Sequence, residues 1–383
     1  MEGGGLMLYE LFAWLEQSFA FPGATAMAFI STRTGLAAVS SLLISLFIGK
    51  RIIQWLRRMQ LGEVVRDDIG LDHQSKQGTP TMGGVIILLS TLIPSLLFVR
   101  MDSIYGWLIF FVMLALGLVG FIDDYIKVVK KDKSGLAGRF KIAGQVSVGL
   151  ILGLVLYSHP DFESVNTLST VPFAKNLNLD YAYFGETLGW IIYLGVSIFI
   201  ITAVSNATNL TDGLDGLATG ISAISGIVFA LFAYVSGRID FSGFLDIMYL
   251  PGAGELTVFA AALVGACMGF LWYNTHPASV FMGDTGSLAL GGAFGALALM
   301  LHKELLLPFI CGVFFFETVS VIIQTSYFKY TKWTTGEGQR FFLMAPIHHH
   351  FEKKGWSESK IVVRFWIIAI LMALISLLTL KIR

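Results

Sequence analysis

The sequence predicts an all-α polytopic integral membrane protein with ten transmembrane helices, both termini extracytoplasmic and a cleft on the cytoplasmic face. Three observations support this fold class. Hydrophobic residues make up 55% of the 383 residues and charged residues only 14%, whereas soluble domains carry roughly a quarter charged residues. Many nearly uncharged windows are about 20 residues long, enough for a helix to cross a hydrocarbon core of ~30 Å. These windows do not alternate in polarity, which disfavours a lipid-facing β-barrel.

The predicted spans follow one another along almost the whole chain, without a repeat of fixed period. They run near 25–49, 82–99, 104–122, 140–157, 187–205, 216–236, 256–273, 287–301, 304–327 and 361–380. The N-terminal stretch carries Glu2, Glu10 and Glu16 and lacks a basic start, so no cleavable signal peptide is expected. The chain is therefore expected to form one transmembrane domain over 1–383, with residues 1–6 as an addition to it.

Positive charges are distributed unequally between the loops on the two sides. The loops after the first, third and ninth spans each carry six lysines or arginines, whereas all loops on the other side together carry four. Because lysine and arginine accumulate in cytoplasmic loops, the odd-numbered loops are predicted to be cytoplasmic. The longest loop on the other side, 158–186, carries little charge and is expected to add a short hairpin. The net charge of zero indicates no nucleic-acid partner.

The unusual polar motifs all lie on the predicted cytoplasmic face. Asp123 and Asp124 end the third span in "GFIDDYIKVVKKDKSG", with Lys127 one turn later, and Lys76 precedes the second span in "HQSKQGTPTMGG". The other motifs are "SNATNLTDGLDGLATG", "YNTHPASVFMGDTGS" and "MAPIHHHFEKKGW", which contribute Asn206, Asn209, Asp212, Asp215, Asn274, Asp284, His348, His349 and His350. Five loops that meet on one face are the expected construction of an active site.

The aspartates need a counter-charge, because carboxylates at a membrane–water boundary are costly unless they are paired or bound to a cation. Asp123, Asp124 and Asp284 supply the oxygen ligands that Mg²⁺ prefers, and Mg²⁺ keeps phosphate as a partner. Lysines beside them suit phosphate charge, and the glycines of "TDGLDG" let the backbone pack closely around a polar ligand. Together these features predict phosphoryl transfer onto or from a lipid.

Each motif alone has a simpler explanation. An aspartate pair can be a solvated helix end, and "DGLDG" can be a turn with left-handed glycines. Thr285 or Ser287 in "GDTGS" would cap the helix of the eighth span well. The histidine triplet can be a metal site or a solvated loop, and zinc is disfavoured because three successive residues cannot converge on one ion without irregular backbone. The functional interpretation depends on the coincidence of all five motifs on one side.

Five stretches carry a resemblance to a known family. They are "GTPTMGG", "GFIDDYIKV", "NATNLTDGLDGLA", "FMGDTGSLALGG" and "MAPIHHHFEKKGW", and the match covers residues 36–383. Through them the chain resembles the polyprenyl-phosphate N-acetylhexosamine-1-phosphate transferases. The histidine stretch is similar to their phospho-N-acetylmuramoyl-pentapeptide transferase branch. The resemblance implies ten transmembrane helices around a cytoplasmic-facing active-site cleft, often in a homodimer. One segment departs from the pattern, because "YTKWTTGEGQR" (330–340) is longer than the usual connection.

The resemblance also implies a reaction and roles for individual residues. UDP-MurNAc-pentapeptide and undecaprenyl phosphate would give lipid I and UMP, with Mg²⁺ as cofactor, at the bacterial cytoplasmic (inner) membrane. Asp284 is implied as the main Mg²⁺ ligand, Asp123 as the base or the partner of the lipid phosphate, and Asp124 as their support. The implied substrate-binding residues are Lys76, Lys133, Asn206, Asn209, Asp212, Asp215, Asn274, Phe281, Gln324, His348 and His349, with His348 also counted as catalytic.

The three histidines are expected to do separate jobs. Imidazoles donate to phosphate oxygens without the full cost of fixed cations, and they would meet a soluble UDP-sugar on the cytoplasmic side. Lys353 and Lys354 follow directly and would steer an anionic donor towards them. One of the histidines is expected only to hold the loop in place.

Charge accounting favours direct attack of the lipid phosphate on the β-phosphate of the donor. Both reactants are anionic, so cations must screen their approach and the departing UMP. A covalent aspartyl-phosphate with two displacements is the alternative mechanism. A transferase for another UDP-N-acetylhexosamine is the alternative function. A secondary transporter is disfavoured, because it would place coupling groups near the bilayer midplane, often with inverted repeats.

Overall fold

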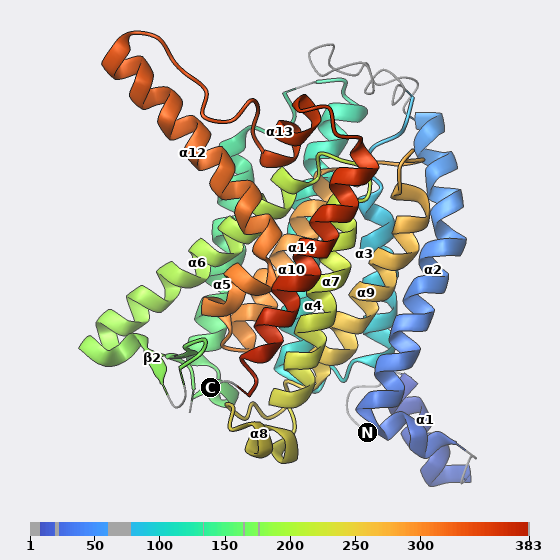
Figure 1. The fold of residues 1–383 in the computed structure, drawn as a ribbon. Coiled ribbons are helices and arrows are strands. Elements are labelled where there is room, and N and C mark those ends of the chain that lie inside the picture. Colours follow the sequence, from blue (N-terminus) through green and yellow to red (C-terminus); the bar gives the residue numbers. More distant parts are fainter. Residues whose placement is uncertain are drawn as a thin grey trace.

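The computed structural model describes residues 8–19, 23–59, 78–132, 134–163, 165–174 and 177–381. Within them the fold is a bundle of helices with one two-stranded hairpin (Figure 1). The long helices are α2 (Ile30–Met59), α3 (Gly84–Phe98), α4 (Ile104–Val128), α5 (Gly138–Ser158), α6 (Glu186–Thr211), α7 (Leu217–Ser236), α9 (Glu255–Asn274), α10 (Gly283–Met300), α12 (Gly312–Thr335) and α14 (Glu358–Leu378). The shorter elements are α1 (Leu8–Phe19), η1 (Ala24–Ala28), η3 (Pro160–Phe162), β1 (Leu168–Thr170), β2 (Asn178–Asp180), η4 (Tyr181–Phe184), α8 (Ile239–Leu245), η5 (Glu304–Leu306), α11 (Leu307–Ile310) and α13 (Ile347–Lys353).

Seven of the described helices are long and apolar enough to cross a membrane. The segment from η5 through α12 is an eighth candidate if its two parts form one span, although they are bent by 89°. The span predicted over 304–327 is not one continuous helix, because the helix breaks around Cys311 and α12 turns away from the bundle (Figure 1). Two further predicted spans form α3 and α10, with 15 and 18 residues. The chain is thus a polytopic helical membrane protein, as predicted.

Helix α10 lies inside the bundle, packed against α3, α4, α6 and α7. All of its residues from Thr285 to Met300 are buried. Glycines and alanines make this burial possible, because small side chains let neighbouring backbones approach closely. A Cβ added at Gly291 would lie 2.5 Å from the Cα of Ser205 on α6. The stretch "GGAFG" is therefore a helix-packing surface.

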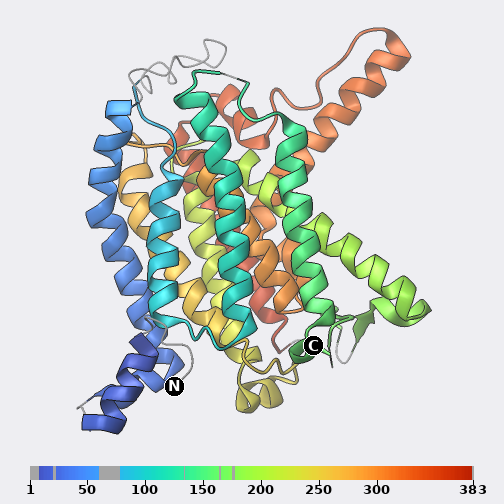
Figure 2. The ribbon, with the colours of Figure 1, turned by 180° about the vertical axis from the view of Figure 1, so that it is seen from behind.

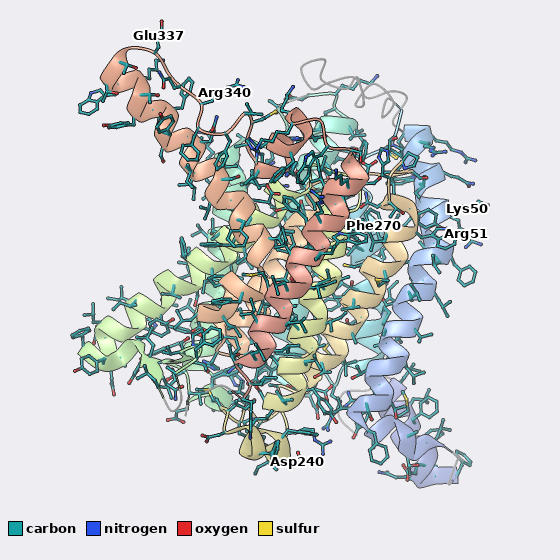
Figure 3. All side chains as sticks on the ribbon, viewed as in Figure 1. Lys50, Arg51, Asp240, Phe270, Glu337 and Arg340 are labelled. Atoms are coloured by element: carbon teal, nitrogen blue, oxygen red, sulfur yellow. The ribbon has the colours of Figure 1, made fainter. Side chains whose placement is uncertain are left out.

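The two ends of the bundle are built differently. Helix α13 and the protruding half of α12 lie at one end, with Glu337 and Arg340 (Figures 1 and 3). Helices α1 and α8 and the hairpin lie at the other end, with Asp240 (Figures 1 and 3). The view from behind shows the same division (Figure 2). We call these the α13 end and the α1 end.

The long connection at the α1 end contains the hairpin that the sequence predicts. Strands β1 and β2 pair antiparallel, three residues each. Lys303, which follows α10, donates from Nζ to Thr170 Oγ1 at 3.0 Å. Both side chains are buried, so the hairpin packs directly onto the connection after α10.

A buried ion pair ties three helices together at the α1 end. Arg33 of α2 donates to the Glu255 carboxylate of α9 through Nη1 and Nη2, at 2.5 and 2.7 Å. Arg33 Nη1 also donates to the Phe98 carbonyl at 2.9 Å, and Glu255 accepts from the Arg100 amide at 2.8 Å. Burying charge costs several kcal/mol per ion unless partners of this kind offset it. The pair therefore fixes how α2, α3 and α9 meet.

Candidate active site

The aspartates meet where α4 passes the first turn of α10. The Asp124 carboxylate on α4 accepts from the Asp284 amide at 3.1 Å and from the Thr285 amide at 2.8 Å. It also accepts from the Thr285 hydroxyl at 2.6 Å. The first amides of a helix need acceptors, and they favour negative charge. The cap of α10 thus comes from Asp124 on a neighbouring helix rather than from Thr285 or Ser287.

The close approach of α4 to α10 depends on Gly120. A Cβ added at this position would lie 2.1 Å from the Asp284 carbonyl oxygen, a separation that real side chains do not reach. The absence of a side chain lets the α4 backbone lie against the first turn of α10. Asp123 and Asp124 follow one turn later on the same helix. The stretch "GFIDD" therefore couples a tight helix contact to the placement of both carboxylates.

Asp123 and Asp284 share two lysines. Lys127 Nζ lies 2.5 Å from Asp123 Oδ2 and 3.5 Å from Asp284 Oδ2. Lys141 Nζ, from α5, lies 2.9 and 2.6 Å from the same two oxygens. The Asp123 side chain is fully buried and that of Asp284 is 15% exposed, while the two lysines are 31% and 22% exposed. The carboxylates are therefore enclosed, and the lysines reach them from the solvent side.

Uncharged donors fix the other oxygen of each carboxylate. Asn209 Nδ2, near the end of α6, donates to Asp284 Oδ1 and to Ser287 Oγ, at 2.9 Å in both cases. The Leu136 amide donates to Asp123 Oδ1 at 2.7 Å. Because Oδ1 is held in both carboxylates, Oδ2 of each faces the shared lysines. Asn209, predicted to bind substrate, is thus in direct contact with the metal-ligand candidate Asp284.

This donor set fits a hard divalent cation. Asp123, Asp124 and Asp284 each offer an oxygen within 4.8 Å of the others, and carboxylate oxygens are ligands that Mg²⁺ prefers. Asp123 Oδ2 is buried and receives no aligned hydrogen bond, since its lysine contacts are charge contacts. Asp124 already accepts three hydrogen bonds from α10. Asp123 and Asp284 are therefore the better-placed ligands.

Asp212 follows α6 directly and lies beside the same carboxylates. Burial raises the pKa of the Asp212 carboxyl well above its usual value, and the negative charge of Asp284 raises it further. Asp212 begins the connection from α6 to α7, which we call the 212–216 loop. Asn274 holds this loop from α9, because its Oδ1 accepts from the Gly216 amide at 3.1 Å. Asn274 is buried, and its contact with the Gly216 amide holds the 212–216 loop against α9.

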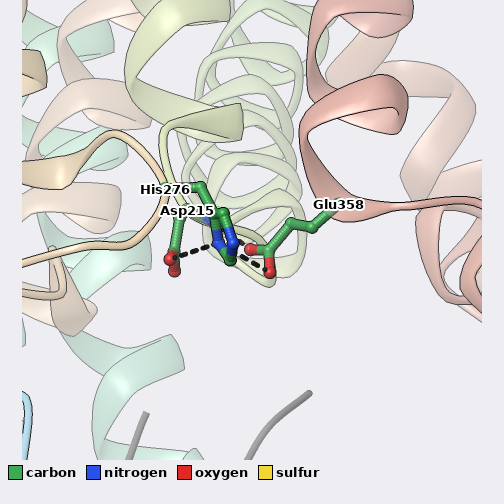
Figure 4. A group of neighbouring side chains, drawn as sticks. All are labelled: Asp215, His276 and Glu358. Carbon is green, nitrogen blue, oxygen red and sulfur yellow. Dashed lines mark hydrogen bonds and ion pairs between the residues drawn. The ribbon is translucent and has the colours of Figure 1, made fainter. Parts of the chain in front are cut away.

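A second group of titratable side chains lies beside the 212–216 loop. Asp215, His276 and Glu358 each offer a ligand atom within 4.8 Å of the others (Figure 4). Asp215 and Glu358 are buried, whereas the His276 side chain is 35% exposed. Asp215 lies in the 212–216 loop, His276 lies in the connection from α9 to α10, and Glu358 is the first residue of α14. The structure thus joins Asp215, a predicted substrate-binding residue, to His276, which lies in the motif "YNTHPASVFMGDTGS" without a predicted role, and to Glu358, which lies outside the motifs.

His348 is enclosed at the start of α13. Its side chain is fully buried, and Nδ1 lies 3.1 Å from the Glu317 carboxylate of α12. This contact is not an aligned hydrogen bond. A Cβ added at Gly213 would lie 2.3 Å from His348 Nε2, so the ring rests against the 212–216 loop. His348 therefore connects α12, α13 and the loop that carries Asp212.

His349 and His350 have different partners. His349 Nδ1 lies 2.5 Å from the Glu352 carboxylate. His350 Nδ1 accepts from the Leu343 amide at 3.1 Å, which requires a neutral ring. Burial, and then the charge of Lys354, lower the pKa of His350 and so favour that neutral form. The three histidines thus have separate contacts, and His350 holds the loop before α13. No group of metal-ligand candidates in the described part of the chain includes them.

Other predicted substrate-binding residues lie around these groups. Asn206 Nδ2 donates to Gln145 Oε1 at 2.9 Å, between α6 and α5. Phe281 lies in the connection from α9 to α10 and is half-buried. Lys76 and Lys133 lie outside the described residues.

Gln324 holds the segment that returns from α12 to α13. Its Oε1 accepts from the amides of Phe341 and Phe342, at 3.1 and 2.8 Å. The longer connection over 330–340 is partly helical, because α12 continues to Thr335. The segment 330–340 thus consists of the end of α12 followed by a return anchored on Gln324, and its greater length relative to the family stays a prediction.

Three residues that no motif pointed to lie at the site. Lys141 contacts Asp284, Glu317 contacts His348, and Glu358 contacts His276. Two of them carried a usable signal: Lys141 and Glu317 are charges inside predicted spans, where charge is costly unless it is paired. Glu358 lies just before the last predicted span and gave no such signal.

Comparisons with known proteins agree with one another. The glycosyl transferase family 4 model matches residues 106–302, and signature 1 of phospho-N-acetylmuramoyl-pentapeptide-transferase matches residues 76–88. The chain is 51% identical over 410 residues to the phospho-N-acetylmuramoyl-pentapeptide-transferase of Flavobacterium psychrophilum, covering 98% of this chain and 100% of the relative. It is 53% identical over 385 residues to that of Salinibacter ruber, with the same coverage.

A helical membrane bundle that matches glycosyl transferase family 4 is a membrane-embedded transferase. The chain is identical to these relatives at about half of its positions over essentially its full length, which identifies the family within this class of transferases. The chain belongs to the phospho-N-acetylmuramoyl-pentapeptide-transferase family. The family resemblance carried by the five sequence stretches is thereby confirmed, and so is the prediction of an enzyme.

Proposed function

We propose that this chain transfers phospho-MurNAc-pentapeptide from UDP-MurNAc-pentapeptide to undecaprenyl phosphate, giving lipid I and UMP. The names of the relatives support the transferred group. The observation that carries the chemistry is the cluster in which Asp123 and Asp284 share Lys127 and Lys141, at one end of a membrane bundle. Such a cluster suits a reaction between a soluble and a membrane-bound phosphate compound.

Asp123 and Asp284 are proposed to hold Mg²⁺, which when bound would neutralise charge on the reacting phosphates. Asp124 is proposed to act indirectly, by fixing the turn of α10 that carries Asp284. The three carboxylates and the two lysines sum to a charge of −1, so a bound Mg²⁺ would give the site the positive charge that anionic substrates need. Lys127 and Lys141 have long flexible stems and are partly exposed, so they can turn from carboxylate to phosphate.

Direct displacement is the proposed mechanism. An oxygen of the lipid phosphate forms a bond to the β-phosphorus of the donor, and the bond from that phosphorus to the bridging oxygen breaks, so UMP leaves. The lipid phosphate is already ionised near neutral pH and needs little help from a base. The Asp123 carboxylate is buried, with Oδ1 fixed by Leu136 and Oδ2 beside two lysines. Its proposed role is therefore to position charge rather than to accept a proton.

Helix α13, which carries the three histidines, is proposed to act on the donor in two ways. His349 is 13% exposed and is the better placed imidazole to reach a donor phosphate. His348 is enclosed between Glu317 and Gly213, so its proposed effect on turnover passes through the 212–216 loop. The predicted catalytic and substrate-binding roles of His348 are thus proposed as one indirect role.

The α13 end is proposed to face the cytoplasm. The loops rich in lysine and arginine belong to this side, and the nucleotide donor is soluble. In this orientation ten spans cross the bacterial inner membrane, with both termini outside. They are the seven long apolar helices, α3, α10, and the bent segment from η5 through α12. The homodimer expected of the family stays a prediction, which mass measurement of the detergent-solubilised protein tests.

UMP release from purified protein tests the proposed function. Release should require UDP-MurNAc-pentapeptide, undecaprenyl phosphate and Mg²⁺ together, because direct displacement needs both substrates at once. A burst of UMP equal to the enzyme concentration without lipid would replace direct displacement by an aspartyl-phosphate route. Equal turnover with UDP-N-acetylglucosamine would favour the alternative donor. Folded protein that releases no UMP under any of these conditions would contradict the proposal.

A further inference from the structure

His276 is partly exposed and lies between two buried carboxylates. Its Nδ1 is 3.2 Å from Asp215 Oδ2 and 3.3 Å from Glu358 Oε2 (Figure 4). The Asp215 and Glu358 side chains are 2% and 4% exposed, against 35% for His276. One ring nitrogen therefore faces two carboxylates that the protein encloses. The proposed chemistry gives His276 no role.

Backbone hydrogen bonds join the same three segments. The Asp215 amide donates to Glu358 Oε1 at 2.6 Å, and the Ala278 amide donates to Asp215 Oδ2 at 3.0 Å. Glu358 lies in the first turn of α14. Asp215 lies in the 212–216 loop, and Ala278 lies in the connection from α9 to α10. Two connections of the chain and the first turn of α14 thus meet at this one point.

Each of the three segments leads to a group of the proposed active site. The 212–216 loop begins with Asp212, and the connection from α9 to α10 leads into Asp284. Helix α14 follows α13, which carries His348. A shift of the meeting point would therefore affect Asp212, Asp284 and His348 together.

We propose that His276 is a positioning residue, whose Nδ1–H is shared by Asp215 and Glu358 and locks the 212–216 loop to the start of α14. The proposal rests on the proposed function, because it takes the 212–216 loop to contact the UDP donor. A charged or neutral imidazole N–H between two carboxylates offsets their mutual repulsion. The contacts of His276 are with Asp215 and Glu358 rather than with Asp123 or Asp284. Loss of the ring should therefore weaken donor binding more than it slows the chemical step.

The same three side chains also have the donor types of a transition-metal site. Two carboxylates and one imidazole suit Zn²⁺. The two possibilities differ in what is needed at the Nδ1 position: a shared proton needs an N–H, whereas a metal needs a lone pair. An asparagine places an amide N–H near the position of Nδ1, and an amide nitrogen is not a metal ligand. His276→Asn therefore distinguishes them.

The experiment compares His276→Ala, His276→Gln and His276→Asn in the full-length protein, with UMP release measured against UDP-MurNAc-pentapeptide concentration. The alanine and glutamine variants should raise KM for the donor about tenfold, the size expected for a lost hydrogen bond to a charged group. Their kcat should change by less than about twofold. His276→Asn should restore KM to within about twofold of the wild-type value.

His159→Ala is the matched control. The His159 side chain is 36% exposed and its Nδ1 lies 3.8 Å from the Asp161 carboxylate. It thus resembles His276 in exposure and in having an acidic neighbour, but it follows α5 at the α1 end. Both kinetic constants should be unchanged in this variant.

Three outcomes would overturn the positioning role. An unchanged KM in all three His276 variants, with active wild-type protein, would show that the contact does not shape the donor site. A fall in kcat at unchanged KM would place His276 in the chemical step. Stoichiometric zinc in the wild type, absent from all three variants by elemental analysis, would replace the shared proton by a metal. If the wild type releases no UMP, the proposed function fails separately, and calorimetric binding of the UDP donor to the same variants still decides the role of His276.

Discussion

Two buried ionic clusters, one towards each end of the bundle, differ in how their charges are paired. At the α1 end, Arg33 and Glu255 form a two-point pair, and their side chains are only 1% and 8% exposed. At the α13 end, Asp123 and Asp284 share two lysines that are 31% and 22% exposed. Both clusters hold helices together, but only the second contains charged groups that solvent can reach.

This difference distinguishes a structural pair from a reaction site. A two-point arginine–carboxylate pair has a fixed geometry, and removing either partner leaves an uncompensated buried charge. A lysine shared by two carboxylates can change partner when a phosphate arrives, because its stem is flexible. Substitutions in the first cluster should therefore change stability, and substitutions in the second should change turnover.

Glu255→Gln should have the largest effect on stability. It leaves the buried Arg33 charge without its carboxylate, which typically costs about 3–5 kcal/mol. Tm in detergent should fall by several degrees, while kcat and KM of the folded protein stay near their wild-type values. Asp240→Asn is the control, because Asp240 pairs with Arg238 at 56% and 43% exposure, and exposed pairs contribute about 0–1 kcal/mol. Equal Tm losses in both variants would contradict the account of the first cluster.

Asp284→Asn should have the largest effect on turnover among substitutions of similar size. An amide is a poor Mg²⁺ ligand and leaves the two lysines with one fewer carboxylate. The loss should be about 3 kcal/mol or more, on the order of a hundredfold in kcat. Steady-state UMP release at saturating Mg²⁺ measures it, with Tm as a check on folding. Retention of more than about half of the activity would show that Asp284 is not a metal ligand.

Lys141→Gln should reduce kcat about tenfold, or ~1.4 kcal/mol. Lys141 Nζ lies 2.6 Å from Asp284, closer than Lys127 Nζ at 3.5 Å. Lys127→Gln should therefore have a smaller effect on kcat. Lys130→Gln is the control, since Lys130 is exposed just after the end of α4, the helix that carries Lys127. The assignment fails if Lys130→Gln and Lys141→Gln reduce UMP release equally.

His350→Ala should have the smallest effect, about 1 kcal/mol, or roughly fivefold in activity. His350 Nδ1 accepts from the Leu343 amide, and its pKa is lowered, mainly by burial. The ring is therefore neutral in the folded protein, and its contribution is present above the unfolded pKa and lost as pH falls through the folded pKa. Activity of the wild type should persist at pH 8. A steep loss of activity between pH 7 and pH 8 that His350→Ala abolishes would show that the ring acts as a cation.

The convergence of Asp123, Asp124 and Asp284 could be predicted from the sequence, because carboxylates stand out in an almost uncharged chain. Their separate roles could not. Asp124 caps α10, and this depends on α4 passing the first turn of α10, a contact between distant parts of the chain. The partner Lys141 likewise depends on how α4 and α5 pack. Lys141 lies at the edge of the predicted span 140–157, where the sequence does not show which group it would pair with.

The broken span shows another limit of sequence patterns. Residues 304–327 form one apolar run, and hydropathy does not register a change of direction inside it. Pro308 and Gly312 lie on either side of the break at Cys311. The residues next to the break are buried, namely Leu307 and Ile310 of α11 and Gly312, Val313 and Phe314 of α12, whereas most of α12 beyond them is not. Composition therefore fixes the membrane class but not the course of this helix.

Binding of Mn²⁺, which substitutes for Mg²⁺ and is visible by electron paramagnetic resonance, tests most directly whether the α13-end cluster is the metal and reaction site. Wild-type protein and Glu255→Gln should bind one ion per chain in the presence of UDP-MurNAc-pentapeptide. Asp284→Asn should bind it at least about tenfold more weakly, since it loses a charged oxygen ligand. Equal Mn²⁺ affinity in all three proteins, or loss in Glu255→Gln alone, would contradict the central claim.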